Sequence, residues 1–285
     1  MPATGPSTAG ETQSVFSLSY SLDHSHISFR LNPHRTVNDD ELKHAVLDEV
    51  MKQFHEKQYQ SINHEKPISH EQDQERFLEF FDIEPETAKN ILEEHHRNPE
   101  KLRVTYNALY KSLSFVLMAT FTHDVHMSWI THAIGMACFE RKLTPSELNL
   151  LEVGSNAREW ARLMNYKCFY YVTDQFKELQ SFSGAYNLSI KEPDAFITPE
   201  NRYWPVLVVE SGWSESRAHL EENAELWLRG SEGQVMTVII IKWTKSPHTK
   251  TVSGDLQVLH LSDNELEASQ SEVCIYYHKH CNIDW

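Results

Sequence analysis

The feature that most constrains the fold is a strand, a helix and a second strand that follow one another directly in the C-terminal half. Residues 206–210 and 235–243 are rich in β-branched side chains, and residues 214–229 between them carry apolar side chains along one helix face. Within the second strand, residues 238–241 are apolar without alternation, which is typical of a strand covered on both faces. Strands joined by a crossover helix predict an α/β domain.

Further β-prone runs and two helices precede this unit. The β-prone runs are bounded by turn residues and cover residues 168–173, 186–190 and 195–197. Helical spacing over residues 125–137 is followed by Thr144 and Pro145, which are typical of the start of another helix. We therefore expect one α/β core over residues 121–285.

Residues 15–120 are strongly acidic, and we expect them to be mainly helical. Alternating polarity predicts a hairpin whose strands cover residues 15–22 and 26–31. One helix is expected after Asn38, a favourable N-cap, and another from Pro85. Residues 115–118 are compatible with a strand or with a buried helix. The region is predicted to form an acidic N-terminal portion beside the α/β core.

Composition and hydropathy predict the cellular compartment of the protein. Of the 285 residues, 40% are hydrophobic and 24% are charged, as in ordinary globular proteins, and residues 1–14 have the composition of a disordered tail. No run approaches the roughly 18 to 20 apolar residues of a membrane span, and the first residues lack a secretory signal. The four cysteines are expected to be free thiols. We therefore expect an intracellular protein, in the cytoplasm or nucleus, without membrane contact.

The net charge bears on the partner. A nucleic-acid-binding protein normally presents a positive surface, whereas this chain has a formal net charge of −15. The acidic residues are concentrated between Asp39 and Glu100, which leaves room for a locally basic cleft elsewhere. A nucleic acid, DNA or RNA, therefore remains a candidate partner, as does a protein that contacts the acidic region.

Two carboxylates near the ends of neighbouring strands form the candidate site. An apolar strand that ends in Glu210 brings this acid to the edge of a buried sheet, where an unpaired charge is costly. Asp194 on a neighbouring strand would repel it unless a cation lies between them, and such hard oxygen ligands suit Mg²⁺ or Mn²⁺. In the plainer alternative, Asp194 caps a turn after Pro193 and Glu210 pairs with Lys242.

The same residues resemble a known superfamily. The motif consists of Pro193-Asp194, the strand that ends at Glu210, Ser214-Glu215-Ser216 at a helix start, and the apolar strand 238–242. It resembles the PD-(D/E)xK, or restriction-endonuclease-like, superfamily, and residues 210–216 are similar to an uncharacterised fungal branch of it. The resemblance covers residues 191–243 well. It implies a mixed sheet flanked by helices and a divalent-metal-dependent nuclease.

The resemblance also implies roles for individual residues. Asp194 would bridge the metal ion, Glu210 would be the second acid, and the Ser211 carbonyl would be a further metal ligand. The family lysine that orients the attacking water is replaced by Gly212. Members of the superfamily can move this lysine to another element, and Lys242, in phase with the apolar side chains of its strand, is the best candidate. Lys191 and Arg217 are weaker candidates.

A catalytically inactive nuclease-fold protein is the alternative, with the acidic region as a binding or scaffold surface. The missing lysine and the negative net charge favour this alternative, whereas the presence of both acids favours the enzyme.

Other chemically suggestive residues are better explained by structure. Ser214 lacks the surroundings of a hydrolase nucleophile and is expected to cap its helix. No glycine-rich phosphate loop is present. Two groups have metal-binding side chains but poor spacing for zinc: His123, His126 and His132, and Cys274, His278, His280 and Cys281.

Overall fold

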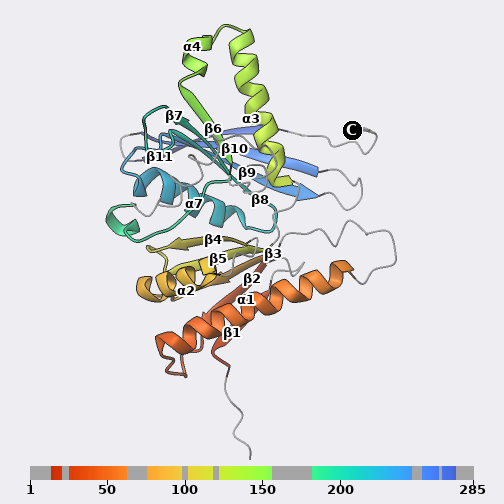
Figure 1. Ribbon diagram of the computed structural model, residues 1–285, viewed down its shortest axis with the longest axis vertical. Helices are drawn as coiled ribbons and strands as arrows, with labels where there is room; N and C mark the ends of the chain where they lie inside the picture. The colour runs from red at the N-terminus through yellow and green to blue at the C-terminus, as the bar shows by residue number, and fades with distance from the viewer. Residues whose placement is uncertain are drawn as a thin grey trace, which may run out of the picture.

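The computed structural model describes residues 14–20, 26–62, 76–97, 102–117, 122–155, 182–245, 252–262 and 265–273. Two sheets dominate these residues, with helix α7 (Arg217–Gly230) between them (Figure 1). The predicted strand 168–173 and the cysteine and histidine group near the C-terminus lie outside the described residues.

The first sheet has five strands in the order β1-β2-β3-β5-β4. Its strands are β1 (Phe16–Tyr20), β2 (His26–Leu31), β3 (Arg76–Phe80), β4 (Leu102–Asn107) and β5 (Ser112–Leu117). The predicted hairpin is confirmed, because β1 and β2 pair antiparallel, whereas β2 and β3 pair parallel. Figure 1 shows α1 (Asp39–Ile62) and α2 (Pro85–Arg97) on the face away from α7.

The prediction of a mainly helical N-terminal portion is not confirmed, because these five strands lie within it. In β3, Leu78 and Phe80 belong to the core formed with α1 and α2, while Phe77 contacts a histidine ring of α7 on the opposite face. A strand buried on both faces carries no alternating polarity, so its sequence lacks the usual strand signal. The two predicted helices are confirmed, and the Asn38 side chain accepts from the Glu41 amide at 2.9 Å.

The second sheet has six strands in the order β11-β10-β9-β8-β7-β6. Its strands are β6 (Leu151–Ser155), β7 (Ala195–Pro199), β8 (Leu207–Gly212), β9 (Thr237–Lys245), β10 (Val252–Ser262) and β11 (Glu265–Val273). All neighbours pair antiparallel except β8 and β9, which are parallel and are joined by α7. The mixed sheet confirms the α/β prediction.

Helices cover both faces of this sheet. Leu220, Ala224 and Trp227 of α7 form one core with alternate residues of β8 and β9. On the other face, Ile130 of α3 (Thr122–Phe139) packs against the remaining alternate residues of the strands. The predicted helix start at Thr144 is also confirmed, since its side chain caps the short helix α4 (Pro145–Leu148).

Two local predictions are wrong. Residues 186–190 are not a strand: Tyr186 ends the short 3₁₀ helix η1 (Gly184–Tyr186), and a positive φ at Leu188 interrupts extended backbone. In this segment Ile190 forms an isolated bridge with Tyr106 of β4. The cap of α7 is Ser216 rather than Ser214, because the Ser216 hydroxyl accepts from a backbone amide of the first turn.

Candidate active site

The strand register brings the two predicted acids opposite each other. Asp194 immediately precedes β7, and the first residue of β7, Ala195, pairs with Val209 of β8. The next position along β8 is Glu210, so Asp194 and Glu210 are cross-strand neighbours. Both residues are buried. Two facing carboxylates in a low-dielectric region require compensating charges or donors.

Asp194 obtains this compensation from two strands. Its Oδ2 accepts hydrogen bonds from the backbone amide of Ser211 at 2.7 Å and from the Ser211 hydroxyl at 2.9 Å. Its Oδ1 forms an ion pair with Arg103, which lies on β4 of the first sheet. The Asp194 side chain is 0% exposed, and that of Arg103 is 13% exposed. The carboxylate therefore links β8 of the second sheet to β4 of the first.

The negative charge of Glu210 is compensated by Lys191, which precedes Asp194 in the sequence. Lys191 Nζ lies 3.0 Å from Glu210 Oε2, and both side chains are almost fully buried. The indole N–H of Trp227 on α7 donates to Glu210 Oε1 at 2.7 Å. Lys191 also lies 3.5 Å from the Thr105 hydroxyl of β4. The plainer alternative predicted an ion pair between Glu210 and Lys242. In the structure, Glu210 pairs with Lys191.

The structure explains why no lysine stands at position 212. A Cβ atom on Gly212 would lie 2.9 Å from the Cβ of Glu215, so this position has no room for a side chain. Lys242 of β9 lies opposite Gly212 in the register and donates to the backbone carbonyl of Trp213. Arg217 points elsewhere, to Glu221 and Asp255. Of the three proposed substitutes, Lys191 contacts an acid of the pair, at 3.0 Å from Glu210.

The four charged side chains form a formally neutral group, because Asp194 and Glu210 are balanced by Arg103 and Lys191. We refer to these residues as the acid site. Each carboxylate oxygen has a protein cation or hydrogen-bond donor as a partner. The charge compensation explains how two facing acids are tolerated in a buried position.

The donor set agrees in kind with a hard divalent cation, since it consists of the carboxylates of two cross-strand neighbours and a nearby carbonyl, that of Ser211. Arg103 does not fit such a set of metal ligands, because its guanidinium is paired with the Oδ1 atom of Asp194. Among the described residues, no group of three or more His, Cys, Asp or Glu side chains is placed to hold a metal ion. The Mg²⁺ or Mn²⁺ site thus stays a prediction.

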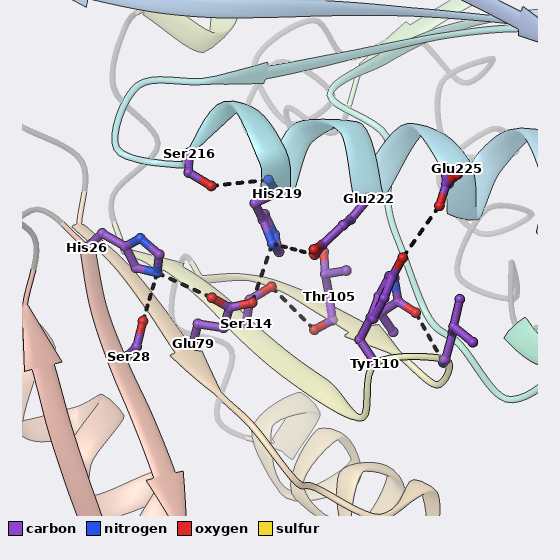
Figure 2. Close-up of polar contacts among 12 residues, drawn as sticks. His26, Ser28, Glu79, Thr105, Tyr110, Ser114, Ser216, His219, Glu222 and Glu225 are labelled. Carbon is purple, nitrogen blue, oxygen red and sulfur yellow. Dashed lines mark hydrogen bonds and ion pairs between the residues drawn. The ribbon is translucent and has the colours of Figure 1, made fainter. Parts of the chain in front are cut away.

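A second buried charge cluster lies nearby, between the first sheet and α7 (Figure 2). Glu79 of β3 lies 3.4 Å from Nδ1 of His219 on α7 and 3.3 Å from Nε2 of His26 on β2. His219 Nδ1 also lies 3.7 Å from Glu222. We refer to Glu79, His219, His26 and Glu222 as the interface cluster.

Attraction between oppositely charged side chains stabilises the interface cluster. Burial alone would lower the pKa of His219, but the contacts with Glu222 and Glu79 outweigh it and raise the pKa to about 10. Burial would raise the pKa of Glu79, but the contacts with His219 and His26 lower it to about 2. His219 is therefore a buried cation and Glu79 a buried anion near neutral pH.

The structure describes the remaining predicted groups only in part. His132 is exposed on α3, and the side chains of His123 and His126 are not among those described. Ser214 is buried, two residues before the helix cap. Sequence reasoning missed Arg103, Glu79 and His219 altogether. No local pattern indicates them, because their partners lie on other elements of the fold.

Comparison with protein-family models, curated proteins and solved structures finds no match to this chain. Within the described part of the chain, every helix is too short or too polar to cross a membrane.

Proposed function

We propose that this chain has a restriction-endonuclease-like core and acts as a divalent-metal-dependent nuclease of the PD-(D/E)xK type. One observation carries the proposal: Asp194, next to the start of β7, is the cross-strand neighbour of Glu210 on β8, and a buried lysine, Lys191, contacts Glu210 at 3.0 Å. The two acids and the lysine that the sequence resemblance requires are thus in one place, although the lysine comes from another position. The mixed sheet with a helix layer on each face further supports the proposal.

Each residue of the acid site has a role in this proposal. Asp194, Glu210 and the Ser211 carbonyl would hold Mg²⁺ or Mn²⁺, which when bound supplies an activated water and neutralises charge on a phosphodiester. The Ser211 amide and hydroxyl orient Asp194, and the Trp227 indole orients Glu210. Lys191, whose ammonium carries donors beside Glu210, would orient the attacking water.

A second candidate function is supported by the pairing of the acids. All four carboxylate oxygens already have protein partners, and Arg103 neutralises Asp194 from the first sheet. This pattern also suits a nuclease-fold protein without catalysis, in which the group joins the two sheets and the acidic N-terminal region binds a protein partner.

One experiment separates the two candidates. Mn²⁺ is titrated by calorimetry into the wild type, Asp194→Asn and Asp255→Asn, and each protein is then assayed on single- and double-stranded DNA and RNA. Asp255 is the matched control, because it is an exposed acid of β10 paired with Arg217. The nuclease proposal expects Mn²⁺ binding and cleavage by the wild type and the control, with a loss of at least about 100-fold in Asp194→Asn. Absence of Mn²⁺ binding, or binding without cleavage of any substrate, would instead support the second candidate.

A further inference from the structure

The first sheet closes the acid site through its edge strand β4. Arg103 of β4 pairs with Asp194, and Thr105 lies beside Lys191. Next to the Thr105–Lys191 contact, Tyr106 and Ile190 exchange backbone hydrogen bonds of 2.8 and 2.9 Å. The closure is nearly complete, since the Asp194 side chain is 0% exposed. A nucleic-acid strand cannot reach a carboxylate that is buried to this extent.

A second set of contacts holds the same sheet against α7. Figure 2 shows Glu79 of β3 pointing toward His219 and Tyr110 pointing toward Glu225. The Glu79–His219 ion pair spans 3.4 Å, and the Tyr110 hydroxyl lies 3.4 Å from the Glu225 carboxylate. The sheet is thus attached through charged and polar groups at two separate places.

Apolar side chains also meet at this interface, since Ile190 packs against the core of the first sheet and the Phe77 ring lies against that of His219. The core of the first sheet is formed with α1 and α2, and the core around α7 is formed with β8 and β9; the two share no residue. Interfaces between separately cored units that rely on polar contacts permit relative motion more readily than a continuous apolar core does. Opening of the first sheet would therefore leave both cores largely intact.

We propose that the first sheet is a regulatory cover of the acid site, and that Arg103 is the counter-ion that a divalent cation displaces when the cover opens. This inference rests on the proposed nuclease function. Arg103 balances one of the two negative charges of Asp194 and Glu210, so its removal leaves the acid site with a net negative charge. A dication binds such a site more strongly than a neutral one.

The test measures Mn²⁺ affinity by calorimetry in the wild type, Arg103→Gln, Arg103→Lys and Glu79→Gln. Arg103→Gln is expected to bind Mn²⁺ about tenfold more tightly than the wild type, the scale of one unit charge in a partly screened site. Arg103→Lys retains the charge and is expected to behave like the wild type. Glu79→Gln weakens the cover at a distance from the acids, and a smaller gain of about threefold is expected.

Hydrogen exchange gives a second measurement that does not depend on metal. In both Gln variants the amides of β4 are expected to exchange faster than in the wild type, while those of β8 and β9 keep their rates. Glu79→Gln also covers the case in which Arg103→Gln does not fold, because Glu222 remains as a partner of His219.

The outcomes distinguish this inference from the proposal on which it rests. Equal Mn²⁺ affinity in the wild type and both Gln variants would overturn the cover and leave the metal site standing. Weaker binding in Arg103→Gln would also overturn it. If no variant binds Mn²⁺, the nuclease proposal fails, and the regulatory cover fails with it.

Discussion

The acid site and the interface cluster are both buried groups of opposite charges between the same two sheets, but they differ in hydrogen bonding. In the acid site, Asp194 and Glu210 accept bonds of 2.7 to 3.0 Å from Ser211, Trp227 and Lys191. In the interface cluster, the ion pairs of His219 span 3.4 and 3.7 Å, and neither ring nitrogen has a hydrogen bond of normal geometry.

The difference shows which group is fixed by short hydrogen bonds and which relies more on charge. Short bonds from backbone, indole and ammonium donors fix the orientation of the two acids, as a site for a ligand requires. The longer contacts of His219 rely on Coulomb attraction, which depends less on direction and more on protonation. We therefore expect the acid site to respond to changes in its cations and the interface cluster to respond to pH.

The largest effect is expected for Lys191→Met. This change leaves the buried Glu210 carboxylate without its cation, which destabilises the fold by about 3 to 5 kcal/mol and abolishes cleavage if Lys191 orients the water. The free energy of unfolding is measured with denaturant. Lys52→Met is the matched control: it removes an exposed pair with Glu49 and is expected to cost less than about 1 kcal/mol.

A double variant sharpens this prediction. Adding Glu210→Gln to Lys191→Met removes the unpaired charge and is expected to restore part of the lost stability. If Lys191→Met is as stable as the wild type, Glu210 is not compensated by Lys191, and the description of the acid site as a neutral group is wrong.

The second-largest expected effect is a pH-dependent loss of stability in Glu79→Gln, which disrupts the interface cluster. Glu79→Gln is expected to lower the free energy of unfolding by about 3 kcal/mol where His219 is charged and Glu79 ionised. The pKa of His219 is raised to about 10, so its contribution is complete below pH 6.5 and is lost as pH rises through 10. The pKa of Glu79 is lowered to about 2, so its contribution is complete above pH 4.5 and is lost as pH falls through 2.

Denaturant unfolding of the wild type and Glu79→Gln across this range measures the difference between them. It is expected to be largest between pH 4.5 and 6.5 and to shrink on both sides. The other charged groups around His219 are Glu222 on α7 and Glu215 just before that helix, and His26 bonds Glu79 from β2; all three are present in both proteins. If the difference in the free energy of unfolding does not change with pH, then Glu79 and His219 do not have the shifted pKa values given above.

The two regions also differ in how far the sequence predicts them. Asp194 and Glu210 were expected on neighbouring strands because a short motif and an apolar strand mark them, and the register brings them opposite each other. The sequence also offers Lys191, just before that motif, as a weaker candidate for the displaced lysine. The cation Arg103 could not be predicted, since it lies 91 residues away from Asp194 and on another sheet.

The elements of the fold also divide into those that the sequence predicts and those that it does not. The hairpin and the periodic helices were predictable, because each has one solvated face that leaves a pattern in the sequence. Strand β3 was not, because Glu79 and Phe77 face α7 while Leu78 and Phe80 face the helices. Phe77 and Glu79 are also the side chains through which β3 contacts α7, so the interface cluster was missed together with its strand.

A smaller effect is expected for Ser216→Ala. The Ser216 hydroxyl accepts from the His219 amide at 3.1 Å and caps α7. Its loss is expected to cost about 1 kcal/mol, measured by denaturant unfolding, with Ser216→Asp retaining the cap. The change touches the helix that carries His219 but leaves the acid site in place, so Mn²⁺ affinity is expected to stay unchanged. A loss of Mn²⁺ binding would mean that the two clusters are more strongly coupled than their separate contacts indicate.

The smallest effect is expected for Arg217→Gln. Arg217 was a weaker candidate for the displaced lysine, but it pairs with Glu221 at 3.2 Å and Asp255 at 2.7 Å on partly exposed side chains. Exposed pairs of this kind contribute less than about 1 kcal/mol, so stability and cleavage are both expected to remain close to the wild type. A loss of cleavage comparable to that of Lys191→Met would reverse the assignment, since it would place the water-orienting cation on α7 rather than beside Glu210.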